Sequence, residues 1–171
     1  MNQIRNLLDR IIEAWACLMM AVMLFVSSWQ IVSRYVFRDP ITFSEEFLRY
    51  ALVWLSLVGL AYANGKGAHI ALDLMRDLPA ATRRRLDLFA QLMLILFAAA
   101  VMIGGGSHAM SLAAAQVSPV LGISMAWVYL ALPVSGVLTI VYSAFNILSM
   151  FAVANESVMP VAVIQGENHA A

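Results

Sequence analysis

The sequence predicts an all-α integral membrane protein with four transmembrane helices, and three observations carry this prediction. The 171 residues are 63% apolar and 12% charged, with a mean hydropathy of +0.84. A soluble domain of this length could not bury so much apolar surface, because its surface-to-volume ratio is too high. The apolar residues also fall into four runs, each near the about 20 residues that a helix needs to cross a bilayer. We expect one membrane domain over residues 1–154 and a short cytoplasmic tail over 155–171.

The first run spans residues 11–33 and holds one charge, Glu13, near its start. Arg5 and Arg10 precede it, as in a cleaved signal peptide. However, Asp9 lies in the same segment, and no small-residue cleavage site ends the run. We therefore interpret it as a retained membrane helix.

The second run spans residues 46–64, and Thr42 and Glu45 just before it have the spacing of a capping box. Arg49 lies in the first membrane turn, on the same helix face as Glu45 and Glu46. Arginine at this depth is costly unless it reaches water or a carboxylate. Two interpretations stay open: these are solvated interfacial charges, or they form an ion-pair contact with another helix of this chain or of a partner.

Residues 66–85, between the second and third runs, predict a short amphipathic element at the lipid headgroups. His69 and Asp73 share its polar face with the spacing of two metal ligands. Two ligands without a third nearby make a weak motif, so we expect no metal site.

The third run spans residues 86–108 and the fourth spans 124–152. Three consecutive glycines from Gly104 interrupt the third run, and Pro133 lies inside the fourth, so both helices can kink or approach a neighbour closely. Ser135, Thr139 and Ser143 form a small polar stripe on the fourth run. Such a stripe marks a helix-packing surface, either within the chain or against a partner.

The basic residues predict that both termini lie in the cytoplasm. With the N-terminus inside, two basic residues of the N-terminal arm and five of the connection 66–85 lie on the cytoplasmic side, against three outside. Cytoplasmic loops carry such an excess of Lys and Arg.

Several function classes are disfavoured by what the sequence lacks. The centres of the four runs contain no Asp, Glu, Lys or Arg, whereas a proton-coupled exporter needs a carboxylate in mid-membrane. A haem-carrying anchor needs two axial ligands at similar depth, but His69 and His108 are expected on opposite sides. No phosphate-binding loop, nucleophile triad or metal cluster is present, so we expect no enzyme and no cofactor. A net charge of zero gives no indication of a nucleic-acid partner.

One set of residues carries a family resemblance. The set comprises Arg34–Phe37, Pro40–Ile41, Glu45–Tyr50, Trp54, Gly59–Ala63 and His69–Asp73, followed downstream by Leu121–Tyr129, Leu132–Pro133 and Gly136. In these residues the chain resembles the small membrane (Q-type) subunit of tripartite ATP-independent periplasmic (TRAP) transporters. The resemblance covers all four runs, but not the N-terminal arm or the tail.

The resemblance implies a multi-pass protein of the bacterial inner membrane that braces a large multi-helix TRAP subunit. That partner would carry the substrate and sodium sites, and a periplasmic substrate-binding protein would deliver an organic anion, commonly a carboxylate. The small subunit would contact its partners and membrane lipids, and would hold no cofactor. We assign the family-like positions to fold integrity or subunit contact; they are Glu45, Glu46, Arg49, Trp54, Gly59, His69, Asp73 and Pro133.

Two alternatives stay open. An independent small proton-coupled transporter would depend on Glu13, because this is the carboxylate nearest to the membrane interior. A redox membrane-anchor subunit would bind haem.

Overall fold

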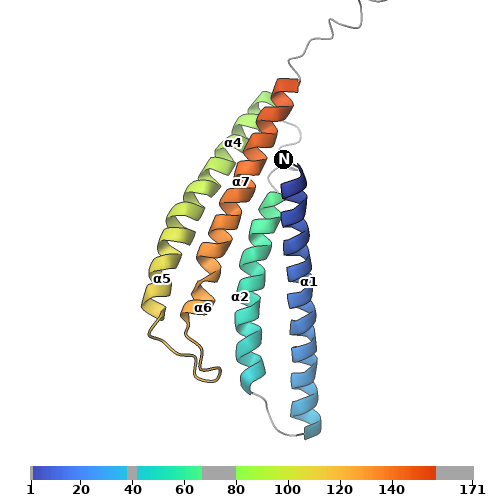
Figure 1. Cartoon of the computed structure of the whole chain (residues 1–171), viewed down its shortest axis with the longest axis vertical. Coiled ribbons are helices and arrows are strands. Elements are labelled where there is room, and N and C mark those ends of the chain that lie inside the picture. The colour runs from blue at the N-terminus through green and yellow to red at the C-terminus, as the bar shows by residue number, and fades with distance from the viewer. Residues whose placement is uncertain (1, 38–41, 67–79, 157–171) are drawn as a thin grey trace, which may run out of the picture.

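The structure is a computed structural model that describes residues 2–37, 42–66 and 80–156, and it is helical almost throughout these ranges (Figure 1). The first helix, α1, covers Asn2–Val32 and continues as a π-helical segment, η1, over Ser33–Phe37. The second, α2, covers Thr42–Gly65. The third is continuous through α4 (Ala80–Phe97), η2 (Ala98–Gly105) and α5 (Gly106–Ala113). A short helix α6 (Ala126–Tyr129) precedes α7 (Ala131–Glu156).

Four helices in these ranges are long and apolar enough to cross a membrane, which confirms the predicted fold class. They are Arg5–Val36, Thr42–Gly65, Arg84–Ala113 and Ala126–Met150. The predicted amphipathic element falls largely on residues 67–79, and most of the predicted tail falls on residues 157–171. Both segments lie outside the described residues, and so do His69 and Asp73.

The four long helices are arranged in a row rather than in a closed bundle (Figure 1). The order across the row is α1, α2, α7 and then the helix formed by α4, η2 and α5. Tyr142, Ser135 and Ser143 of α7 are the largest fully buried side chains. At the edge of the row, α1 packs mainly against α2 and is largely exposed along its apolar length. A row of this kind leaves broad apolar faces for lipid or a partner protein.

The start of α1 and the end of α7 lie at the same end of the row, as the predicted topology requires (Figure 1). We call this the terminal end; it also contains the end of α2 and the start of α4. The opposite end, the loop end, contains the end of α1, the start of α2 and the connection 114–125.

The contact between α1 and α2 follows a seven-residue repeat. One set of less exposed residues of α1 and η1 recurs at alternating spacings of four and three, with Trp15 and Ser27 beside it: Ile12, Ala16, Met19, Met23, Val26, Gln30 and Ser33. This is the spacing that keeps one seam of a helix against a neighbour in left-handed packing. The first helix is therefore attached along one narrow seam.

Small residues allow α7 to approach its neighbours. A Cβ on Gly136 would lie 2.9 Å from Met102 Cβ, and one on Gly106 would lie 2.9 Å from Leu132 Cβ. The predicted stripe of Ser135, Thr139 and Ser143 is buried, so this packing surface is used within the chain.

The glycines of the third helix and the proline of the fourth affect their helices in different ways. The glycines from Gly104 do not break the third helix, because the chain passes through the π-helical turns of η2 instead. The fourth helix is interrupted at Leu130, between α6 and α7, and Pro133 lies in the first turn of α7. Proline is tolerated there because it lacks an N–H group that the first turn leaves without a helical partner.

Candidate functional site

At the loop end, Glu46 holds the connection between the third and fourth spans. The carboxylate oxygen Oε2 accepts hydrogen bonds from the backbone N–H groups of Val120 (3.2 Å) and Leu121 (3.0 Å). The other oxygen accepts a hydrogen bond from the Tyr50 hydroxyl at 2.6 Å. The side chain comes from the first turns of α2, and only 9% of the residue is exposed. A buried carboxylate satisfied by several donors fixes the position of the groups that surround it.

The loop that Glu46 holds has an ordered backbone of its own. The N–H of Ser118 donates to the Ile123 carbonyl at 2.9 Å, and that of Met125 donates to the Gln116 carbonyl at 2.9 Å. Gly122 turns the chain with φ +66°, a conformation that glycine adopts without steric cost. The loop therefore forms a tight hairpin-like turn rather than a loose connection.

The neighbouring acidic residue, Glu45, lies in a different environment. Its carboxylate is 3.8 Å from the guanidinium of Arg49, and about seven-tenths of each side chain is exposed. Glu45 and Arg49 thus share a face of α2, as predicted, and they form an ion pair. An exposed pair of this type contributes little to stability.

At the terminal end, a polar cluster joins α1 to α2 and α7. The Tyr142 hydroxyl donates to Asp9 at 2.8 Å, and the Tyr62 hydroxyl donates to Glu13. Lys66 lies 3.4 Å from Asp9 and 3.6 Å from Glu13. The hydrogen bond with Tyr62 and the charge of Asp9 raise the pKa of Lys66 above its usual value. The cluster thus neutralises charges that lie close to the membrane.

Amide groups extend this cluster along α2 and α7. Asn64 donates to the Ser143 hydroxyl at 2.9 Å, and Asn146 donates to the Asn64 carbonyl at 3.0 Å. Arg5 donates to the Gly65 carbonyl. Sequence reasoning missed this network, although the i, i+4 spacing of Arg5, Asp9 and Glu13 places all three on one face of α1.

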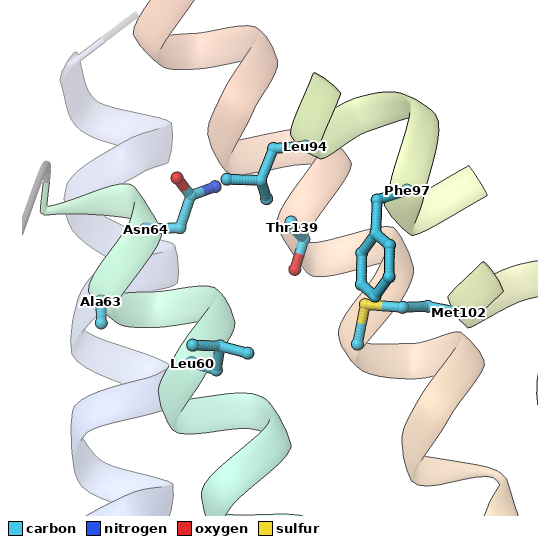
Figure 2. A pocket seen from close by; sticks show the side chains of 7 residues that line it. All are labelled: Leu60, Ala63, Asn64, Leu94, Phe97, Met102 and Thr139. Atoms are coloured by element: carbon cyan, nitrogen blue, oxygen red, sulfur yellow. The ribbon is translucent and has the colours of Figure 1, made fainter. Parts of the chain in front are cut away.

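An apolar groove lies between α2 and the third helix, over α7 (Figure 2). It has a volume of about 310 Å³. Leu60, Ala63 and Asn64 of α2 face Leu94 and Phe97 of α4, with Met102 of η2 and Thr139 of α7 completing the lining. The Thr139 hydroxyl donates to the Ser135 carbonyl of its own helix, so it adds little polarity to the groove.

The other predicted site residues have separate positions. Trp54 packs against the cluster formed by Ile12, Val58 and Tyr142, at the junction of three helices. Gly59 has no described atom outside its own helix within 4 Å of the place where a Cβ would stand. The predicted site residues that the structure describes are therefore not gathered into one site: they are distributed along α2 and at the start of α7.

The acidic side chains described above make contacts within the chain. In the described part of the chain, no three His, Cys, Asp or Glu side chains come close enough to hold a metal ion. The acidic groups of the two end clusters accept hydrogen bonds from tyrosines and backbone amides or pair with basic side chains. The terminal cluster thus connects helices, and Glu46 connects α2 to the loop between the third and fourth spans.

Comparisons with known proteins agree with the resemblance. Residues 23–153 match the model of the DctQ component of the tripartite ATP-independent periplasmic transporters. The chain is 32% identical over 138 residues to the sialic acid TRAP transporter small permease protein SiaQ of Vibrio cholerae, which covers 80% of this chain and 79% of that one. It is 30% identical over 135 residues to a putative TRAP transporter small permease protein of Haemophilus influenzae, covering 79% of this chain and 82% of that one.

A third relative has a different length. The chain is 32% identical over 110 residues to the sialic acid TRAP transporter permease protein SiaT of Haemophilus influenzae. The match covers 64% of this chain and 18% of that protein. A segment like this one is thus present within a much longer permease chain.

Proposed function

The chain belongs to the DctQ component family of the TRAP transporters, and it is therefore a small permease subunit of the bacterial inner membrane. We propose that it braces a large transport subunit during uptake of an organic anion. The large subunit would bind the substrate, commonly a carboxylate, together with sodium ions. A periplasmic binding protein would deliver the substrate. The small subunit would take no part in ion or substrate binding and would need no cofactor.

The observation that carries the proposal is the confinement of charge to the two ends of the helices. Along α2 no Asp, Glu, Lys or Arg lies between Arg49 and Lys66, which at 1.5 Å per residue are about 26 Å apart. The centres of the other described helices contain none of these four residue types either. A protein with its own ion path places ionisable groups at this depth. A bracing role needs only packing surfaces, and the open row of helices offers them.

The terminal end is proposed to face the cytoplasm, because the sequence places more basic residues at this end than at the loop end. The loop held by Glu46 would then face the periplasm, on the side from which the binding protein approaches. Trp127 and Tyr129 near this loop are exposed, and such aromatic residues suit the periplasmic interface of the inner membrane.

The roles proposed for the family-like residues divide between the inside of the chain and its surface. Glu46, Trp54 and Pro133 have contacts within the chain, which supports a role in fold integrity. Gly59 is half-buried, but it lies on a face of α2 where Leu52, Ser56 and Leu60 are exposed and its Cβ position is open, so a partner helix could approach closely there.

Glu45 and Arg49 are assigned to contacts outside the chain. Most of each side chain is exposed, which supports a role at the surface. His69 and Asp73 keep the assignment to fold or subunit contact as a prediction.

The alternative of an independent proton-coupled transporter is disfavoured by the surroundings of Glu13. This carboxylate accepts a hydrogen bond from Tyr62 and pairs with Lys66 at the terminal end. These contacts place Glu13 in the polar cluster at the terminal end, where it connects α1 to α2, and not in the centre of the membrane where a proton carrier is needed.

Reconstitution into proteoliposomes tests the proposal. Vesicles would contain this chain alone, the large subunit alone or both, with the binding protein loaded with sialic acid or a dicarboxylate outside. We expect sodium-dependent uptake when both membrane subunits are present, and none with the small chain alone. Uptake by the small chain alone would refute the bracing role, and a Soret absorbance in the purified chain would support the redox anchor instead.

A further inference from the structure

A second apolar groove lies between α1 and α2 at the loop end. It has a volume of about 500 Å³, within the range of small-molecule sites. In Figure 1 the two helices diverge toward this end. The lining residues are Met20, Met23, Leu24 and Ser27 of α1 with Glu45, Leu48, Arg49 and Leu52 of α2. The groove is therefore apolar along its length and carries two opposite charges at its rim.

The depth of the groove matches one leaflet of the bilayer. Arg49 lies about 26 Å from Lys66 along α2, and Glu45 lies one turn farther, about 32 Å away. The hydrocarbon core of a bilayer is about 30 Å thick. If Lys66 lies at one boundary of this core, Glu45 and Arg49 lie at the headgroups of the other leaflet. Leu52 and Met20 lie deeper, at the level of the acyl chains.

The two rim charges have bonding capacity left for a ligand. They lie 3.8 Å apart, beyond the usual length of a hydrogen bond, and most of each side chain is exposed. A guanidinium carries five N–H donors and binds phosphate in a two-pronged geometry. A carboxylate accepts hydrogen bonds from an ammonium group.

We propose that this groove binds a phospholipid of the outer leaflet with a phosphoethanolamine headgroup. One acyl chain lies between α1 and α2 against Met23 and Leu48, the phosphate binds Arg49, and the primary ammonium binds Glu45. The lipid fills the space where α1 and α2 separate, and so supports the edge helix over the half of its length that lies far from the terminal polar cluster.

The charge pattern also predicts which lipids bind less well. Phosphatidylcholine has a quaternary ammonium, which cannot donate a hydrogen bond to Glu45. Phosphatidylglycerol has a phosphate for Arg49 but no cation, so it leaves Glu45 facing an anion. A site that recognises both charges should therefore prefer phosphatidylethanolamine over both.

Native mass spectrometry of the full chain in detergent micelles tests the proposal. The chain would be titrated with phosphatidylethanolamine, phosphatidylcholine and phosphatidylglycerol that carry the same acyl chains. We expect one tightly retained phosphatidylethanolamine, bound at least fivefold more tightly than the other two. Arg49→Gln should weaken its binding at least fivefold, and Glu45→Gln should remove the preference over phosphatidylglycerol.

Two further variants separate the groove from general lipid contact. Ser27→Phe fills the groove and leaves both charges, so it should lower the retention of all three lipids. Arg10→Gln removes an exposed arginine at the terminal end and should change nothing. Helical circular dichroism would confirm that each variant is folded.

Two results would overturn the proposal. Equal retention of the three lipids by the wild-type chain would indicate ordinary contact with the surrounding bilayer. Efficient cross-linking of a Ser27→Cys variant (with Cys17 replaced by alanine) to the large subunit, without retained lipid in the complex, would assign the groove to a partner helix. Neither result depends on the proposed transport role, which the uptake experiment tests separately.

Discussion

Replacing Glu46 with alanine removes the carboxylate that holds the loop between the third and fourth spans. The backbone N–H of Val120 then loses its acceptor, whereas Leu121 keeps the Ser118 hydroxyl oxygen at 3.1 Å. A hydrogen bond to a charged group contributes about 1.5–3 kcal/mol. With the Tyr50 contact also lost, we expect the free energy of opening this loop to fall by about 2–4 kcal/mol.

Hydrogen exchange of the backbone amides measures this change directly. Because each 1.4 kcal/mol corresponds to a factor of ten, exchange at Val120 and Leu121 should accelerate by about 30-fold or more. Glu45→Ala is the matched control, since its carboxylate precedes Glu46 by one residue and pairs with exposed Arg49 instead. Unchanged exchange in Glu46→Ala, or an equal acceleration in Glu45→Ala, would refute the reasoning.

Three further variants test the terminal end. Gly65→Ala places a Cβ where it overlaps the Tyr142 ring, so we expect a loss of about 1–3 kcal/mol in stability, measured by thermal unfolding in detergent. Tyr142→Phe removes the hydroxyl that donates to Asp9 and should cost about 1 kcal/mol in the same assay; no loss would mean that Lys66 alone satisfies Asp9. Glu13→Gln should leave uptake by the complete transporter nearly unchanged, and abolished uptake would revive the proton-coupled alternative.

The sequence was sufficient for the membrane class and the four spans, because lipid imposes both length and apolarity on each helix. The sequence also predicted that the start of α1 and the end of α7 lie at the same end of the row, because four consecutive membrane spans return the chain to the side where it began. The arrangement in a row could not be predicted, since the spans are mostly apolar and their hydropathy does not show which helices are neighbours. The seven-residue seam of α1 becomes visible only when burial is known.

The roles of individual polar residues were harder to predict. Glu45 and Glu46 are adjacent and chemically alike, and only the position of a loop more than 70 residues away distinguishes them. Asp9 and Tyr142 are 133 residues apart, so no local pattern links them. The stripe from Ser135 to Ser143 was recognised as a packing surface, but its partner was α2 and the third helix within the same chain.

We propose that this chain braces the large subunit through the face of α2 that carries Leu52, Ser56 and Leu60. Gly59 and Gly105 offer a matched pair of tests, because at neither position does a described atom outside its own helix lie within 4 Å of the place where a Cβ would stand. Gly59 lies on α2, whereas Gly105 lies in η2 of the third helix, at the opposite edge of the row from α1. Each would be changed to leucine and co-purified with a tagged large subunit. We predict that Gly59→Leu lowers the recovered complex at least fivefold and that Gly105→Leu does not, whereas equal recovery of both variants would contradict the account.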